Sequence, residues 1–239
     1  MIIIPDKVAF IKVPKAASTT IARLFWDRHG VSQTSRLAPD VATTVRHFVN
    51  LDEVGKTVPV LNGNWFYNRS GAFGWHTGYA DLMHIFGDQL DDFHWIASVR
   101  HPVARLFSVF SFQVAKKRID ASLTAEDFEA FCTRVFDGCK DMSQQQLVHT
   151  WPQTHWLPPE GVDCSIIRQE SLADDLERLS NKVATFKDAK LSSINRSFKG
   201  AWQTYISPEL SLKIEAFYSA DMERFKYEPA SVGDKRRVA

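Results

Sequence analysis

The stretch Val8-Ala9-Phe10-Ile11-Lys12-Val13-Pro14-Lys15-Ala16-Ala17-Ser18-Thr19-Thr20 decides the fold of this chain. It begins as an apolar run typical of a buried strand and continues into a turn of small residues with one lysine and three hydroxyl groups. A helix-like run follows at residues 21–26, so the N–H groups of the first helical turn and the helix dipole should face any anion that Lys15 binds. The segment therefore predicts a strand, loop and helix over residues 8–28 that bind a phosphate or sulfate group.

This loop differs from the phosphate loop of nucleoside triphosphatases. That loop requires the pattern G-x-x-x-x-G-K-[ST], whereas no glycine occurs here between Met1 and Arg28 and the lysine precedes the small residues. By itself, the segment is also compatible with a capped helix that follows an edge strand. A second motif is therefore needed to choose between an anion site and a purely structural turn.

A second strand, turn and helix are predicted over residues 94–117. Arg100 follows an apolar strand, and Pro102 is suited to the first position of the next helix. Ser108 lies eight residues after Arg100, about two helical turns, so both side chains can reach one phosphate. Arg105 between them is either a further ligand or a solvated or salt-bridged helix arginine. The two motifs together predict a ligand with two phosphate-like groups.

Both motifs resemble those of sulfotransferases that use 3'-phosphoadenosine 5'-phosphosulfate (PAPS), particularly the bacterial and Golgi carbohydrate sulfotransferases. The first loop is similar to the family pattern [KH]-x-P-K-[TA]-[AG]-[ST]-[ST], and the second matches R-x-P-x-x-R-x-x-S at every fixed position. The resemblance implies that the first loop binds the 5'-phosphosulfate and the second motif the 3'-phosphate. The implied nucleotide ligands are Lys15, Ala16, Ala17, Ser18, Thr19, Thr20, Arg100 and Ser108.

The order of predicted elements favours an α/β fold. Predicted strands near 8–13, 94–99 and 164–168 alternate with helices near 17–28, 77–87, 102–117 and 170–179, and a last helix runs from Ser207 to about residue 225. This pattern predicts a mainly parallel sheet flanked by helices, and 239 residues suffice for one core. The resemblance, which runs loosely over residues 8–227, implies the P-loop-like sulfotransferase fold. We expect one domain over residues 1–239, with a flexible tail at about 230–239.

Two residues are predicted to carry the chemistry. Lys15 is suited to stabilise negative charge on the leaving phosphate, because its ammonium can approach the bridging oxygen of the phosphosulfate. His76 is the candidate base, since family members have a histidine after a glycine and shortly before a helix, and histidine titrates near neutral pH. His155 is the rival base. The family also implies that Gln153 and His155 contact the acceptor, although a purely structural aromatic loop explains that segment equally well.

A weaker nucleotide contact is expected at residues 195–199. Family members have an Asn-x-Ser element in this region, which implies that Ser197 and Lys199 close over the nucleotide. The arginine and lysine here are separated by two residues, so the Arg-Lys-Gly triplet of many cytosolic sulfotransferases is not reproduced. A plain polar loop is the alternative. No metal is expected, since the sequence has no His, Cys or carboxylate cluster with ligand spacing.

Composition limits the partners and the compartment. A net charge of +1 and a pI near 7.8 argue against nucleic-acid binding, and no apolar run of 18 residues is present to span a membrane. The three cysteines have no metal-ligand spacing and leave one unpaired in any disulfide scheme, which suits a reducing compartment. We therefore expect a cytoplasmic protein, although a trimmed lumenal domain would have the same composition.

These observations predict a sulfotransferase that moves the sulfuryl group of PAPS to a hydroxyl by in-line displacement. A carbohydrate or glycoconjugate acceptor is favoured by the branch of the family that the motifs resemble and by an aromatic cluster at residues 65–75. A kinase-like phosphotransferase is the first alternative, which the loop spacing disfavours. A non-catalytic nucleotide-binding module on the same fold is the second. The sequence leaves the oligomeric state open.

Overall fold

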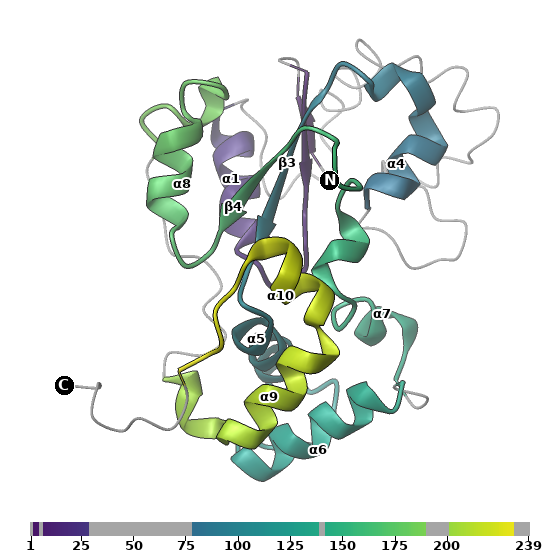
Figure 1. Cartoon of the computed structure of the whole chain (residues 1–239), viewed down its shortest axis with the longest axis vertical. Helices are drawn as coiled ribbons and strands as arrows, with labels where there is room; N and C mark the ends of the chain where they lie inside the picture. Colours follow the sequence, from purple (N-terminus) through teal and green to yellow (C-terminus); the bar gives the residue numbers. More distant parts are fainter. Residues whose placement is uncertain (1, 5–6, 29–77, 139–141, 190–200, 232–239) are drawn as a thin grey trace. The chain divides into compact units, whose positions relative to one another are not determined.

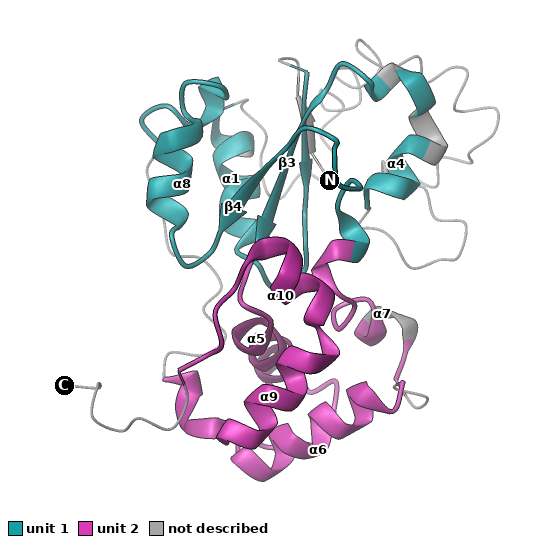
Figure 2. Ribbon diagram, viewed as in Figure 1, with its two compact units in different colours: residues 1–99, 155–194 teal, residues 100–154, 195–239 magenta. Residues whose placement is uncertain are grey.

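The computed structural model describes residues 2–4, 7–28, 78–138, 142–189 and 201–231. The chain divides into two compact units, each built from two separate segments (Figure 2). Unit 1 contains residues 1–99 and 155–194, and unit 2 contains residues 100–154 and 195–239. Several predicted features lie outside the described residues: His76, Ser197, Lys199, the aromatic cluster at 65–75 and the tail from residue 232.

Unit 1 is built around a four-stranded sheet with the strand order β1-β2-β3-β4 (Figure 1). The β2, β3 and β4 strands are parallel, and β1 pairs with β2 in the antiparallel direction. In the register, Phe10 lies opposite Ile96 and Ile96 opposite Ser165. The predicted α/β fold with a mainly parallel sheet is confirmed. The strands are β1 (Ile2–Ile4), β2 (Val8–Ile11), β3 (His94–Val99) and β4 (Cys164–Arg168).

Helices cover both faces of this sheet. Alternate strand residues point to opposite faces and so pack against different helices. On one face, Phe10 packs against Phe25, with ring centroids 5.5 Å apart, and Phe25 packs against Phe186 at 5.3 Å. On the other face, Trp95 meets Tyr79 edge to face at 4.8 Å. The first face is covered by α1 (Ser18–Arg28), α8 (Leu172–Leu179) and η3 (Ala184–Phe186), and the second by α4 (Tyr79–Phe86), which runs into η1 (Gly87–Leu90).

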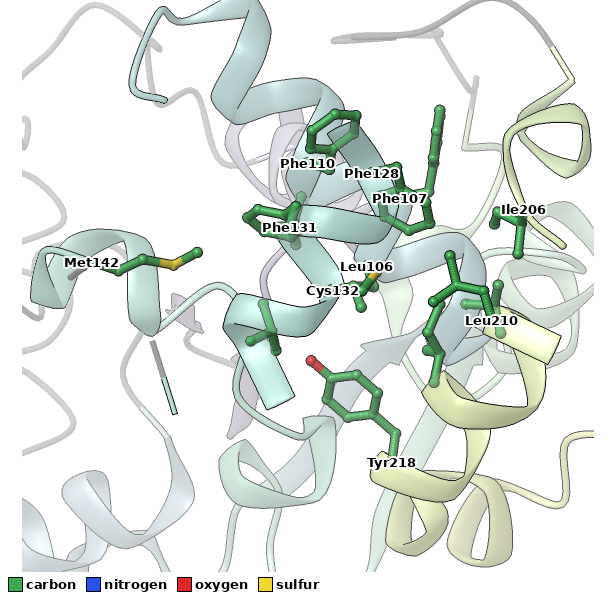
Figure 3. Close-up of a cluster of buried hydrophobic side chains, with 14 residues drawn as sticks. Leu106, Phe107, Phe110, Phe128, Phe131, Cys132, Met142, Ile206, Leu210 and Tyr218 are labelled. Atoms are coloured by element: carbon green, nitrogen blue, oxygen red, sulfur yellow. The ribbon is translucent and has the colours of Figure 1, made fainter. Parts of the chain in front are cut away.

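Unit 2 is helical and has its own hydrophobic core (Figure 3). Phe128 of α6 contacts Phe107 and Phe110 of α5, with centroids 5.1 and 5.3 Å apart. This packing fixes α5, the helix that follows Arg100. The elements of unit 2 are α5 (Pro102–Ala115), α6 (Ala125–Phe136), α7 (Gln144–Leu147), η4 (Trp202–Tyr205), α9 (Pro208–Phe217) and α10 (Ser219–Phe225), and η2 (Gln153–Trp156) spans the junction at residues 154 and 155.

Side-chain caps explain where the helices of unit 2 begin. His101 accepts the N–H of Val103 at 3.3 Å in front of α5, and Pro102 occupies the first helical position. Ser207 accepts the N–H of Leu210 at 3.1 Å in front of α9. Both starts agree with the predicted boundaries.

The last predicted helix differs from the structure. One helix was expected from Ser207 to about residue 225, whereas the structure has α9 and α10 with a break at Tyr218. Tyr218 is buried, and its hydroxyl donates to the carbonyl of Thr150 at 2.5 Å. Phe217, the last residue of α9, is 43% exposed. The contact with Thr150 is 68 residues away along the chain, so no local sequence pattern signals the break.

Candidate functional site

The loop after β2 has an unusual backbone conformation. Lys15 and Ala17 have φ values of 63° and 58°, in the left-handed region that residues other than glycine rarely adopt. Such residues alternating with right-handed ones turn successive N–H groups toward one side, which forms a concave binding site for anions. The sequence predicts an anion loop here without glycine, and the positive φ values of Lys15 and Ala17 are compatible with such a loop.

Helix α1 begins directly after this loop. The carbonyl of Ala17 accepts the N–H of Ile21 at 3.2 Å, so the N–H groups of residues 18–20 form the first helical turn and have no acceptor within the helix. Ser18 is buried, whereas Lys15, Thr19 and Thr20 are half-buried. Lys15, the three hydroxyl residues and the first-turn N–H groups thus follow one another in a short segment of unit 1. This combination can hold a tetrahedral anion.

Lys12 is a charged residue of this loop to which the sequence analysis gave no role. It follows β2 and is only 5% exposed. Burial lowers the pKa of its ammonium group from 10.5 to about 8. Its place at the first position of the [KH]-x-P-K pattern was visible in the sequence, but its burial was not.

In unit 2, the backbone of Arg100 is held by the side chain of Gln153. The N–H of Arg100 donates to Gln153 Oε1 at 2.8 Å, and Gln153 Nε2 donates to the carbonyl oxygen of Arg100 at 2.8 Å. Gln153 is fully buried, whereas Arg100 is half-buried. The family resemblance implied that Gln153 contacts the acceptor. In the structure its amide bonds to the peptide groups of Arg100, and the acceptor contact stays a prediction.

Arg105 has neither of the roles that its sequence suggested. Its guanidinium is fully buried and donates to the carbonyl oxygens of His149 at 3.1 Å and Trp151 at 2.6 Å. It also lies over the ring of Tyr218, 5.4 Å from the ring centroid. Arg105 is therefore committed to the protein interior rather than solvated or salt-bridged on the helix surface. A lone arginine in a helix gives no sign of such distant carbonyl partners.

Two further predicted site residues lie within the described residues. Ser108 is half-buried on α5, in the same unit as Arg100. His155 is exposed, and its ring meets that of Trp156 edge to face at 5.3 Å. The exposure of His155 is compatible with the predicted contact to an acceptor, whereas His76, the preferred base, lies outside the described residues.

Three further features of the described residues bear on the predicted chemistry: metal-ligating side chains, membrane-spanning helices and cysteines. In the described part of the chain, no three His, Cys, Asp or Glu side chains group as a metal site. None of the described helices is long and apolar enough to cross a membrane. Cys132 is a free thiol, and burial, together with the charge of Glu129, raises its pKa. Cys132 is therefore an unreactive core residue.

Comparison with known proteins agrees with this arrangement. A family model described as the sulfotransferase family matches residues 2–228, a range that includes both units. Searches against curated proteins and against solved structures gave no significant match. Because this match covers nearly the whole sequence, the chain belongs to the sulfotransferase family and is a sulfotransferase enzyme.

Proposed function

We propose that this sulfotransferase takes its sulfuryl group from PAPS and transfers it to a hydroxyl of a carbohydrate or glycoconjugate acceptor. The observation that carries the proposal is the loop at residues 14–17, where left-handed Lys15 and Ala17 precede the first turn of α1. Sulfotransferases generally use PAPS, and this loop has the charge and donor groups that its 5'-phosphosulfate requires.

The donor would be bound through its two charged ends. Lys15, Ser18, Thr19 and Thr20, with the backbone of Ala16 and Ala17, would hold the 5'-phosphosulfate. Arg100 and Ser108 would hold the 3'-phosphate, and a guanidinium can bind phosphate through two parallel hydrogen bonds. Ser197 and Lys199 would close over the nucleotide.

The transfer would be an in-line displacement at sulfur. The acceptor oxygen attacks the sulfur atom, the bond from sulfur to the bridging oxygen breaks, and adenosine 3',5'-bisphosphate leaves with the electron pair. Lys15 would stabilise the charge that develops on the bridging oxygen. His76 would accept the proton of the attacking hydroxyl, with His155 as the alternative base.

The acceptor class is supported by sequence features. The motifs resemble those of carbohydrate sulfotransferases, and the aromatic residues at 65–75 are suited to stacking against sugar rings. The unpaired cysteine in any disulfide scheme supports a cytoplasmic location.

Two assays test this proposal. In a binding titration, adenosine 3',5'-bisphosphate should bind far more tightly than ATP with Mg²⁺; the reverse preference would favour a kinase-like phosphotransferase. With labelled PAPS and a library of hydroxyl-bearing acceptors, the label should pass to carbohydrates. Tight bisphosphate binding without turnover on any acceptor would indicate a non-catalytic nucleotide-binding module.

The base can be identified with the same turnover assay. His76→Ala should lower the rate about 10²–10⁴-fold, because a positioned base contributes that much, while bisphosphate affinity stays near the parental value. The rate should rise with pH through a group near the usual histidine pKa of about 6.5, and this rise should vanish in the variant. If His155→Ala causes these changes and His76→Ala does not, His155 is the base.

A further inference from the structure

We infer that Gln153 is a positioning residue that fixes the peptide groups of Arg100, and with them the direction in which its side chain leaves the backbone, for binding the 3'-phosphate of the nucleotide. This inference rests on the proposed function, which assigns Arg100 to that phosphate. It gives Gln153 a role distinct from the acceptor contact that the family resemblance implied.

The first observation is the pair of hydrogen bonds between Gln153 and Arg100. Arg100 lies between β3, which ends at Val99, and α5, which begins at Pro102, so its peptide groups belong to neither element. The amide of Gln153 accepts from the N–H and donates to the carbonyl of this one residue, both at 2.8 Å. Two bonds to one residue restrain rotation of both adjoining peptide planes, and these planes set the direction in which the side chain leaves the backbone.

The second observation is that Asp221 fixes which way the amide points. Its Oδ2 accepts from the backbone N–H of Gln153 at 2.8 Å and from Gln153 Nε2 at 3.3 Å. Its Oδ1 accepts from the N–H of Thr154 at 2.9 Å. Because a carboxylate only accepts hydrogen bonds, Nε2 must face Asp221 and Oε1 must face the N–H of Arg100. Asp221 and Gln153 are both fully buried, so water does not compete for these bonds.

The third observation is that the segment before Gln153 is held at three consecutive carbonyl groups. Arg105 binds the carbonyls of His149 and Trp151, and the hydroxyl of Tyr218 binds the carbonyl of Thr150 between them. Gln153 is thus presented from a segment with little freedom to shift. The two arginines of the motif therefore differ in role: Arg100 is the proposed phosphate ligand, and Arg105 holds the segment that carries Gln153.

The test compares two nucleotides that differ in the 3'-phosphate. Gln153→Met keeps the length and volume of the side chain but removes both bonds to Arg100. It should weaken binding of adenosine 3',5'-bisphosphate about tenfold, which is the usual effect of losing a buried hydrogen bond. The affinity for adenosine 5'-monophosphate should not change. Gln113→Met is the matched control, because Gln113 is a buried glutamine of α5 whose amide has no hydrogen-bond partner among the described residues. It should change neither affinity.

A second variant covers the case in which Gln153→Met does not fold. Gln153→Asn retains a donor and an acceptor on a shorter side chain, so it should fold and lose part of the preference for the bisphosphate over the monophosphate. An unchanged preference in this variant would overturn the positioning role. The same holds if Gln153→Met weakens both nucleotides equally, since that result would mean a general structural role.

A double-mutant cycle separates this inference from the proposed function. In the Arg100→Ala background, Gln153→Met should cause no further loss of bisphosphate affinity, because the side chain that it orients is gone. A full additional loss would overturn the positioning role and leave Arg100 as the phosphate ligand. If Arg100→Ala alone keeps the parental affinity, the 3'-phosphate assignment in the proposed function is wrong, and the role of Gln153 falls with it.

Discussion

Lys12 and Lys15 lie three residues apart in one loop, yet their surroundings give them different chemistry. Lys15 is half-buried and has a left-handed backbone. Lys12 is 5% exposed, and burial lowers its pKa to about 8. The charge on Lys12 is therefore held against a desolvation penalty.

At Lys15, we predict a loss of chemistry that exceeds the loss of binding. Lys15→Ala should lower the turnover rate by about 10²-fold or more, because stabilisation of the leaving oxygen is needed only as the bond breaks. Affinity for adenosine 3',5'-bisphosphate, which lacks the sulfuryl group, should fall by less than about tenfold. Steady-state kinetics and calorimetric titration measure the two effects, with the exposed Lys182→Ala as control. Equal losses would make Lys15 an anchoring residue only.

At Lys12, we predict a pH dependence of stability. Its pKa in the folded protein, about 8, lies below the ordinary value of 10.5, so the unfolded chain binds more protons between these two values. The free energy of unfolding should therefore contain a contribution that rises with pH from about 8 to 10.5, by at most about 1.4 kcal/mol per pH unit. Urea unfolding across this range should show the contribution in the parent and not in Lys12→Met. Parallel pH profiles for the two proteins would contradict it.

At the residue scale, the sequence predicted candidate site residues that lie in short local motifs. It did not predict the buried residues that hydrogen-bond to them from distant parts of the chain. The lysine loop and the Arg100 motif are local patterns, and they could be found without a structure. Gln153 bonds to Arg100, 53 residues away, and to Asp221, 68 residues away, so neither contact leaves a local signal. Burial of Arg105 depends in the same way on carbonyl groups more than 40 residues distant.

At the scale of elements, Asp175 joins β4 to α8. Its Oδ2 accepts from the N–H of Arg168 at 2.7 Å and from the hydroxyl of Ser171 at 3.1 Å, and its Oδ1 accepts from Arg178 at 2.9 Å. Partial burial by itself raises the pKa of Asp175, but these hydrogen bonds and the charge of Arg178 outweigh it and hold the pKa below 3.8. The carboxylate is therefore favoured in the folded protein.

We predict that Asp175→Asn destabilises the protein by about 1–2 kcal/mol at pH 7, because the charged acceptor of several hydrogen bonds is lost. Since the pKa of Asp175 is lowered on folding, its contribution is complete above its unfolded value of about 3.8 and disappears as the pH falls through the folded value. The gap between parent and variant should thus close in acid. Denaturant unfolding checks this, with the exposed neighbour Asp174→Asn as control. A pH-independent gap would assign the effect to packing.

Most strands and helices could be predicted from the sequence, whereas the break in the last helix and the edge strand were not. Apolar runs and caps predicted β2, β3, β4 and α5 to within a few residues, since these signals are local. The division of the last helix at Tyr218 was missed, because it depends on a hydrogen bond to Thr150. The edge strand β1 also went unpredicted, although Ile2-Ile3-Ile4 is a β-branched run.

At the scale of the whole molecule, nucleotide binding should appear as stability. Adenosine 3',5'-bisphosphate at 100 times its dissociation constant should raise the free energy of unfolding by about 2.7 kcal/mol. In Arg100→Ala, the gain at the same concentration should fall below about 1 kcal/mol, because one phosphate contact is lost. ATP with Mg²⁺ should give little gain in either protein. A full gain in Arg100→Ala would place the 3'-phosphate elsewhere.

The sequence gives no sign of two compact units. A single domain over residues 1–239 stays a prediction. The family match over residues 2–228 includes segments of both units. Composition and periodicity reveal local elements, but the grouping of elements into units depends on contacts between segments far apart in the sequence, such as β3 with β4.

The two units are built from alternating segments of the chain, which limits how they can be exchanged by recombination. The chain passes from one unit to the other after residues 99, 154 and 194, so no single break in the reading frame separates them. A fragment that ends at residue 99 would carry β3 without its partner β4 and leave an unpaired strand edge, which promotes aggregation. Neither unit can be exchanged with a relative by one recombination event, and we expect the two to have been inherited together.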